Sequence, residues 1–363
     1  MQKKIIALAI ASALTVPALA FAEASVSGQI NMSIDMKKDG AVAPAVENST
    51  NNIVSNQSRL IIKGTEDLGG GLSAMYQLDN RFNADAGSAT NMFDGNTYLG
   101  LQGGFGSVKL GNLDTPFKSS TRNLDVFFDV AGDNRAGTLG GLMGNGHDVR
   151  LNNSLVYTSP SMSGLTVSVG TVFGAEGTTS ATVNKGSDLS LAATYKADAI
   201  YAAVAIDNAK AGDAGTGTLA AGAAGSQFAG TAFSGVETTG DESKAFRLGG
   251  GYSMDAITVN AVYETLTYTS KAVATAGDWK NTNIYVAGKF AISSTDSVRA
   301  AITMAGATKA PGATLVDKAS QLALGYEHGM SKSTSVYATY MKQSGDTGVA
   351  TPSNLSFGMK HAF

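Results

Sequence analysis

The stretch EASVSGQINMSIDMK, residues 23–37, alternates between apolar and polar side chains at almost every position. In an extended chain, one face would carry Val26, Gly28, Ile30, Met32, Ile34 and Met36. The opposite face would carry Ser25, Ser27, Gln29, Asn31, Ser33, Asp35 and Lys37. Because successive side chains of a β-strand point to opposite faces, the pattern predicts a strand with one apolar and one polar surface.

The same alternation recurs to the end of the chain, in sixteen segments by our count. Short turns alternate with longer polar connections; we place the turns near Gly69, Gly106, Ser163, Asp198, Met254, Ser293 and Ser331. An even strand number, with short turns on one side and long loops on the other, is typical of bacterial outer-membrane barrels. Each segment can supply the roughly 9–11 residues that a tilted strand needs to cross a bilayer.

We therefore predict an all-β fold, a 16-stranded antiparallel transmembrane β-barrel. A soluble β-sandwich would also alternate, but it would gather its apolar faces in a dry core. The polar faces here carry Gly, Ser, Thr and Asn with scattered Arg and Lys, which suits a wet interior. In lipid, only a closed sheet pairs every backbone group of a strand, and a barrel of this size leaves an aqueous channel.

The first 22 residues have the features of a removable export signal. Lys3 and Lys4 precede an apolar run, and Ala20-Phe21-Ala22 forms an A-x-A cleavage pattern. The alternative is a membrane anchor, but the apolar run is too short to span a bilayer as a helix. We expect cleavage after Ala22, leaving 23–363 as a single barrel domain in the cell outer membrane.

Composition excludes several classes of protein. The chain has no cysteine, so no disulfide framework supports it, and no later apolar run is long enough for a membrane-spanning helix. Its 26 basic residues are outnumbered by 29 acidic ones, and loss of Lys3 and Lys4 makes the balance more acidic. That balance argues against general nucleic-acid binding. We expect no cofactor and no metal.

The longest interruption of the strand pattern is the insertion 114–150. It begins with Thr115-Pro116, which breaks a strand, and it mixes Phe127 and Phe128 with acidic residues. A connection this long inside a β array is usually functional. We predict that it folds into the lumen of the barrel and narrows it. A second long segment, 208–243, is rich in Ala, Gly and Thr; we expect a surface loop, and a flexible linker between domains is the alternative.

If the apolar faces point to lipid, several charged residues point into the lumen. We predict that the pore and its constriction are lined by Arg59, Lys63, Arg81, Lys109 and Arg150 from the wall, and by Asp125, Asp129 and Asp133 from the insertion. Opposed charges across a narrow channel sort solutes by charge and dipole. The alternatives are wall charges far from the constriction, and structural salt bridges for the loop acids. Arginines favour anions and the acids favour cations, so selectivity stays open.

An enzyme would need a catalytic constellation. His147 has Asp148 beside it, but no Ser or Asp signature surrounds it in the sequence. His328 and His361 fall on the apolar side of their strands. We therefore expect no catalytic site and no enzyme. An adhesin or receptor that uses the segment 208–243 is a third possibility, and it is compatible with transport.

Several segments resemble the general diffusion porins of Gram-negative bacteria, of the neisserial and burkholderial type. The matching text is Ser58-Arg59, Lys63 to Gly69, Gly71-Leu72, Tyr98 to Leu101, Gly104-Phe105-Gly106, Leu110-Gly111, Thr115-Pro116, Arg150, Asn153-Ser154, Tyr157, Ser159-Pro160, Ser163 to Leu165 and Gly358 to Phe363. The resemblance implies a homotrimer in outer-membrane lipid, passing small hydrophilic solutes and ions, with the third long loop bent into the channel. It also implies that the outer-membrane assembly machinery recognises the last strand, which ends in Phe363.

One departure from the family concerns the insertion. The Pro-Glu-Phe-Gly text that marks this loop in enterobacterial relatives is absent, and the nearest text is Val126 to Asp129. The tip of the loop therefore cannot be placed by motif.

Overall fold

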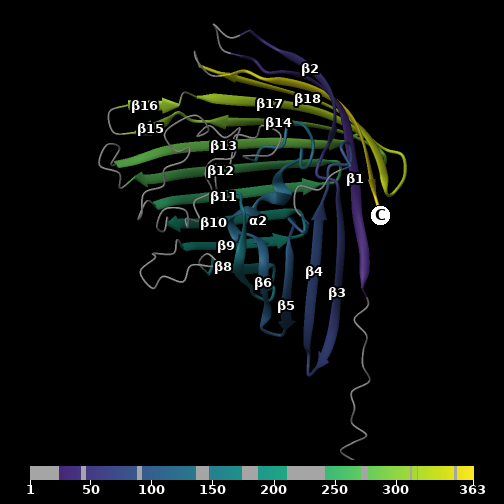
Figure 1. Ribbon diagram of the computed structural model, residues 1–363, viewed down its shortest axis with the longest axis vertical. Coiled ribbons are helices and arrows are strands. Elements are labelled where there is room, and N and C mark those ends of the chain that lie inside the picture. The colour runs from purple at the N-terminus through teal and green to yellow at the C-terminus, as the bar shows by residue number, and fades with distance from the viewer. Residues whose placement is uncertain are drawn as a thin grey trace, which may run out of the picture.

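The computed structural model describes residues 24–41, 46–87, 92–135, 147–173, 187–210, 242–270, 277–310, 313–316, 318–346 and 350–363. Nearly all of the structure in these ranges is β-sheet (Figure 1). The expected export signal 1–22 and most of the segment 208–243 lie outside them. Within them, no helix combines the length and the apolar character needed to cross a bilayer.

Sixteen strands pair in sequence order and close into a ring. They are β1 (Ser25–Lys38), β3 (Arg59–Gly69), β4 (Leu72–Arg81), β5 (Thr97–Gly103), β6 (Gly106–Asp114), β7 (Arg150–Thr158), β8 (Leu165–Val172), β9 (Ser187–Ala197), β10 (Ile200–Lys210), β11 (Glu242–Met254), β12 (Ile257–Ser270), β13 (Gly277–Ala291), β14 (Asp296–Ala305), β17 (Ala319–Gly329), β18 (Thr334–Gly345) and β19 (Ser353–Ala362). Every pairing is antiparallel, and β1 closes the ring on β19 from Gln29↔Ala362 to Lys38↔Ser353. The predicted 16-stranded antiparallel barrel is confirmed.

Three further strands extend this ring. Strand β2 (Ser49–Ser55) pairs with the second half of β1, and the chain then continues into β3, which pairs with the first half. Strands β15 (Thr308–Ala310) and β16 (Ala313–Val316) form a hairpin between β14 and β17. They lengthen the wall at the end of the barrel that carries the long connections.

The two faces of the wall differ as the alternation predicts. On β10, Val204 and Ile206 remain 41% and 45% exposed, whereas Ala205 and Asp207 are each 2% exposed. The other strands of the ring show the same arrangement, with large apolar side chains on the outside of the barrel and polar ones on the inside. This is the inverse of a soluble protein, and we call it the inversion of the wall. A soluble sandwich would bury the apolar face, so this arrangement excludes it. An outward apolar band is what hydrocarbon requires.

Exposed aromatic side chains gather near the short turns. They are Phe105, Tyr195, Tyr252, Phe290, Tyr326 and Phe363. Aromatic girdles of this kind mark the level of the lipid headgroups in outer-membrane barrels. The position of this row therefore indicates one membrane boundary.

The seven short turns lie where the sequence predicts them. Strands β9 and β10 are joined by Asp198 and Ala199, and β11 and β12 by Asp255 and Ala256. Asp198 and Asp255 have φ angles of 43° and 49°. Two-residue hairpin turns need positive φ, which Asp tolerates better than most residues. The long connections consequently all lie at the opposite end of the barrel.

Candidate functional site

The insertion leaves the wall at Asp114 in β6 and returns at Arg150 in β7, two residues that are register partners. The structure describes it up to Arg135 and again from His147. It opens with helix α2 (Pro116–Ser120), capped by the Thr115 hydroxyl, which accepts from the Lys118 amide at 3.2 Å. An N-cap threonine followed by proline is a strong helix start, and this short helix turns the chain inward. The 3₁₀ turn η1 (Arg122–Leu124) follows.

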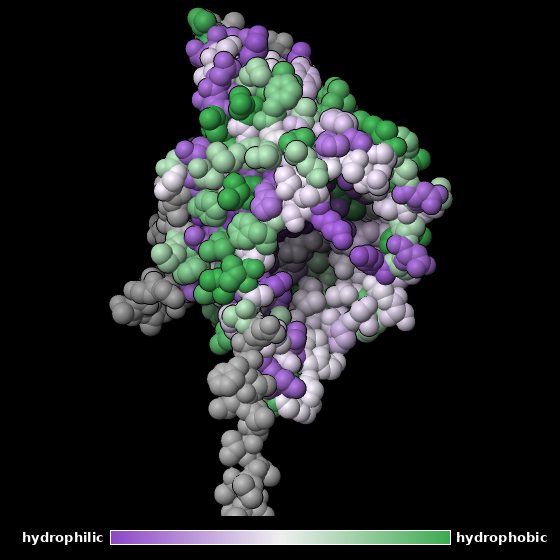
Figure 2. All heavy atoms as spheres, turned by 90° about the vertical axis from the view of Figure 1, so that its right-hand side faces the viewer, coloured by the Kyte–Doolittle hydropathy of each residue, from purple (hydrophilic) through white to green (hydrophobic). Residues whose placement is uncertain are grey.

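Side chains of the inner wall satisfy the backbone of this segment. The Phe117 amide donates to Ser190 Oγ on β9 at 2.9 Å, and Asn260 on β12 donates to the Leu124 carbonyl at 2.8 Å. Further bonds from the wall to loop carbonyls are Arg299 to Val126 at 2.9 Å, Asn31 to Asp129 at 2.8 Å and Gln321 to Gly132 at 3.0 Å. These partners come from β1, β14 and β17. The segment therefore crosses the interior of the ring. Figure 2 shows a hollow in the molecule with hydrophilic side chains at parts of its rim.

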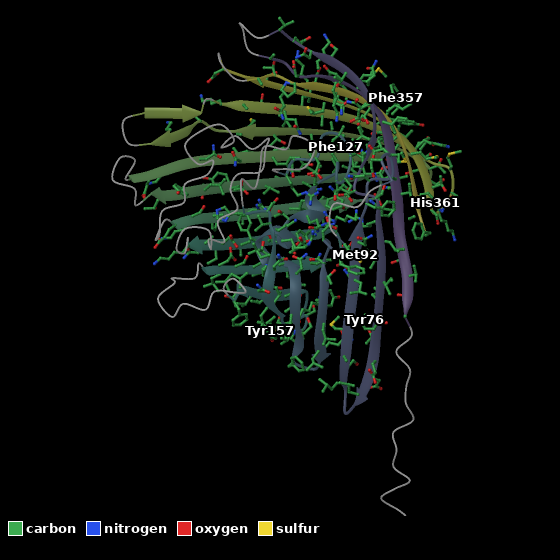
Figure 3. All side chains as sticks on the ribbon, in the orientation of Figure 1. Tyr76, Met92, Phe127, Tyr157, Phe357 and His361 are labelled. Atoms are coloured by element: carbon green, nitrogen blue, oxygen red, sulfur yellow. The ribbon has the colours of Figure 1, made fainter. Side chains whose placement is uncertain are left out.

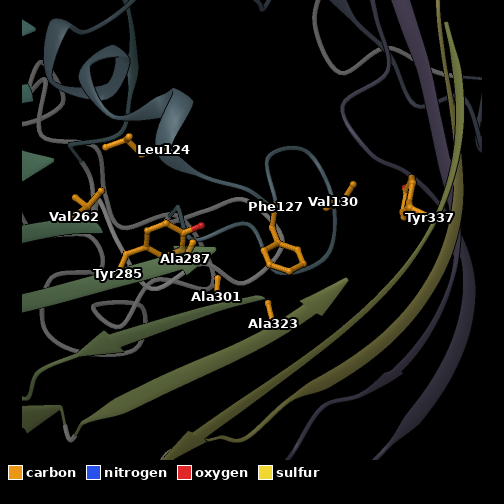
Figure 4. Close-up of a cluster of buried hydrophobic side chains, with 9 residues drawn as sticks. All are labelled: Leu124, Phe127, Val130, Val262, Tyr285, Ala287, Ala301, Ala323 and Tyr337. Atoms are coloured by element: carbon orange, nitrogen blue, oxygen red, sulfur yellow. The ribbon is translucent and has the colours of Figure 1, made fainter. Parts of the chain in front are cut away.

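An apolar cluster holds the middle of the segment. It joins Leu124, Phe127 and Val130 of the loop to Val262, Tyr285, Ala287, Ala301, Ala323 and Tyr337 of the wall. Figure 4 shows the ring of Phe127 above Ala323. Phe127 has no exposed surface, and a Cβ added to Gly325 would lie 3.0 Å from its ring. The small residues of the wall thus make room for this aromatic anchor.

Two of the predicted loop acids act inside the loop. Asp125 accepts from the amides of Phe127 and Asn134, at 2.8 and 3.0 Å, and from the Tyr285 hydroxyl at 3.0 Å. Burial, together with the nearby Asp133 carboxylate, raises the pKa of Asp125 to about 7. Asp133 has no exposed surface and forms an ion pair with Arg135 at 2.6 Å. Neither acid presents a free charge to the channel.

The third acid, Asp129, reaches strand β3 of the wall. Its carboxylate forms an ion pair with the guanidinium of Arg59 at the start of β3, and Arg135 lies 3.8 Å away. Arg59 is the register partner of Arg81 on β4, so these two arginines stand side by side. Arg81 donates to Gln57 Oε1 at 2.8 Å. No carboxylate of the described residues pairs with it.

A second group of cations surrounds one carboxylate at the base of the insertion. Asp114 is 3.0 Å from Lys118, 3.1 Å from Arg122 and 2.9 Å from Arg150. Arg122 and Arg135 also lie over Phe128, each 4.3 Å from the ring centroid. Three cations on one acid leave an excess of positive charge on this side of the channel.

The eight predicted site residues thus divide into two groups. Arg59, Arg81, Arg150 and the three loop acids come together where the insertion meets the wall. Lys63 is exposed further toward the short-turn end, and the ammonium of Lys109 lies 4.7 Å over the ring of Tyr98. Neither lysine forms a hydrogen bond or an ion pair with the described part of the insertion. They line the wall away from the loop.

Sequence reasoning missed Asp114, Lys118 and the wall residue Tyr285. Asp114 ends a strand and had no recognisable role before its three partners were seen. Tyr285 carried a usable signal, because it is an aromatic residue on the polar side of its strand. Such a residue inside a wet barrel needs an apolar partner, and the loop supplies one.

His147 also differs from expectation. Its Nδ1 lies 2.6 Å from Asp207 Oδ2 on β10, and its Nε2 lies 2.7 Å from Ser243 Oγ on β11. The sequence shows no such partners because they are 60 and 96 residues away. His328 Nδ1 lies 2.8 Å from Asp296 Oδ1, and Figure 3 places His361 well apart from Phe127.

Comparison with known proteins connects this geometry to one family. A family model for Gram-negative porins matches residues 7–348. The major outer membrane protein P.IB of Neisseria gonorrhoeae is 32% identical over 132 residues, which cover 35% of this chain and 36% of that protein. Outer membrane porin protein 32 of Delftia acidovorans is 30% identical over 178 residues, covering 48% of this chain and 50% of that protein. The matches thus span between about a third and a half of these relatives.

Solved structures share the fold over almost the whole chain. An anion-selective porin from Comamonas acidovorans superposes with a TM-score of 0.75 at 21% identity, covering 94% of this chain and all of that one. The outer-membrane protein OmpT of Vibrio cholerae superposes with a TM-score of 0.67 at 15% identity, covering 94% and 98%.

Proposed function

The chain belongs to the Gram-negative porin family, and we propose from this premise that it forms a water-filled channel in the outer membrane. Small hydrophilic solutes and ions diffuse through it passively, and transport rather than catalysis is its principal role. The observation that carries the proposal is the inversion of the wall, with an apolar outside and a polar inside. A closed sheet pairs its backbone groups internally in lipid, and a barrel of sixteen strands leaves an aqueous channel at its centre.

The insertion 114–150 is the constriction of this channel. Hydrogen bonds between the described part of this loop and the inner wall support the assignment; they begin at β9 and reach β1. The arginines Arg59, Arg81 and Arg150 face the solute at the narrowest level. Lys63 and Lys109 act on it further along the wall.

The channel prefers anions. Two of the three loop acids are engaged by the loop's own amides and Arg135, and the third is engaged by Arg59. Arg81 has no acidic partner among the described residues, and Asp114 is shared by three cations. Excess positive charge in a narrow, partly desolvated pore attracts anions and repels cations. A structurally similar porin from Comamonas acidovorans is anion-selective.

Reversal potentials across a planar bilayer in a KCl gradient test this proposal. Wild-type protein is expected to conduct and to favour chloride, with the preference falling in Arg81→Gln. Lys38→Gln is the matched control, because Lys38 is an exposed cation paired with Glu47 outside the constriction. Low salt concentration sharpens the contrast, since screening weakens the field. A preference for potassium would refute the selectivity, and protein that passes no ions would refute the channel.

The proposal also covers the export, the assembly and the oligomeric state of the protein. The protein is exported, loses residues 1–22, and assembles as a homotrimer of single-barrel subunits. The assembly machinery recognises its last strand, which ends in Phe363. The backbone of Phe363 exchanges two hydrogen bonds with Gly28, at 2.9 and 3.1 Å, so this end of the chain closes the ring.

A further inference from the structure

The returning arm of the insertion brings together an acid, a histidine and a serine. Asp207 Oδ2 lies 2.6 Å from His147 Nδ1, and Ser243 Oγ lies 2.7 Å from His147 Nε2. The imidazole thus bridges a carboxylate and a hydroxyl through its two nitrogens. A base within hydrogen-bond reach of a nucleophile, itself oriented by a third group, is the structural signature of an activated serine.

The surroundings hold the histidine in this orientation. His147 is 2% exposed, and its ring packs on Phe117 of helix α2 at 5.8 Å between centroids. Asp207 is also 2% exposed, whereas Ser243 is only half-buried. On β11, Ser243 shares a face with the inward-pointing Ala245 and Arg247. The serine is therefore the member of the three that a solute in the channel can reach.

A second carboxylate strengthens the arrangement. Asp188 on β9 is 3% exposed and interacts electrostatically with both Asp207 and His147. The next residue of the loop, Asp148, is bound to Arg247 at 2.7 Å, and Arg247 in turn binds Glu264. Asp148 is therefore neutralised by its own partner. Asp188 and Asp207 are therefore the carboxyl groups nearest the imidazole, and Asp207 is the one that binds its Nδ1.

We propose that Ser243, His147 and Asp207 form a nucleophilic site at the long-loop end of the channel, which accepts an acyl or phosphoryl group from small activated esters. Ser243 Oγ attacks the acyl carbon or phosphorus while His147 Nε2 takes the hydroxyl proton. The bond to the leaving group then breaks, and His147 returns the proton to it, so an alcohol departs. The serine ester that remains is hydrolysed by water in the reverse sense, regenerating the hydroxyl. The covalent step is the one to measure.

A fluorophosphonate probe tests the proposal on the folded full-length protein in detergent. It transfers its phosphonyl group to the serine oxygen and releases fluoride. Mass spectrometry of peptides then reports the labelled residue. Ser253 provides an internal control, because it lies on the same strand and the same face, is exposed, and shares its hydrogen bond only with Thr258.

Ser243 is expected to react at least about tenfold faster than Ser253, and heat-denatured protein is expected to show no such preference. His147→Gln and Asp207→Asn should remove the preference, and the rate should rise with pH in wild type but not in His147→Gln. Equal labelling of Ser243 and Ser253 in folded wild type would overturn the proposal without recourse to any variant. Labelling of Ser243 that survives His147→Gln would also overturn it. Both results leave the channel function untouched.

Discussion

Arg59 at the start of β3 forms an ion pair with Asp129, 70 residues later in the chain. The pair joins the insertion to strand β3. This strand is the neighbour of β1, which closes the ring by pairing with β19. The side chains of both partners remain about a tenth exposed. The pair therefore fastens the insertion to the wall.

Breaking this pair should loosen the constriction. Asp129→Ala removes one partner and leaves Arg59 unpaired, at a cost between about 1 and 3 kcal/mol for a pair that is neither fully exposed nor fully dry. We expect noisier single-channel currents and a stronger preference for anions. Arg59→Ala should give similar noise but a weaker preference, and the double variant should be no noisier than either single variant. Additive noise in the double variant would show that the two residues act separately, and Glu47→Ala, which breaks an exposed pair, is the control.

Removal of the aromatic anchor should release the loop from the wall. Phe127 is fully buried against Ala323, and the Arg299 guanidinium lies 5.0 Å from its ring centroid. Phe127→Ala should cost about 3–5 kcal/mol of loop packing. The barrel itself should persist, because its strands do not depend on this contact. Limited proteolysis should cut the insertion faster in Phe127→Ala than in wild type or in Phe173→Ala, which removes an exposed ring.

Two adjacent glycines of β11 offer a matched pair of substitutions. A Cβ at Gly249 would lie 2.7 Å from both Leu124 and Thr121 of the loop, whereas a Cβ at Gly250 would meet only a carbonyl at 3.8 Å. Gly249→Val should therefore displace the loop and change the conductance. Gly250→Val adds the same side chain to the opposite face of the strand and should leave conductance as it is. Equal changes of conductance in the two variants would contradict the packing of the loop against the inner face of β11.

Asp125 should make loop packing depend on pH. Burial raises its pKa from 3.8 to about 7, so between these values the packed state binds more protons than the released state. Packing is then most stable in acid, weakens as pH rises from about 4 to about 7, and levels off above that. Hydrogen–deuterium exchange of the loop amides, corrected for intrinsic rates, should follow this course. Asp125→Asn should flatten it, and Asp39→Asn, at an exposed acid of another loop, should not.

Much of the architecture was readable in the sequence. The alternation of residues 23–37 and its recurrence predicted which face is apolar, how many strands form the ring and where the short turns lie. It could do so because strand parity is a local property with a period of two residues. In this barrel, strands that follow one another along the chain also lie side by side in the sheet. The strand order therefore needs no information beyond the order of the sequence.

The sites were predictable only in part, for a physical reason. Parity placed Arg59 and Arg81 inside, and the Phe-rich text indicated a loop that packs on something. Parity does not say which charges meet. The pairings depend on contacts that only the folded chain brings about. Asp125 accepts hydrogen bonds from its own loop, and Asp114 pairs with three cations. Asp207 and Ser243 bind the two nitrogens of His147, although both lie far from it in the sequence.

The sequence by itself therefore determined the wall of this protein, since each residue's side depends only on its place along a strand. The tertiary structure decided which of the interior charges stay free, because pairing depends on where a long loop crosses a space that no local pattern describes.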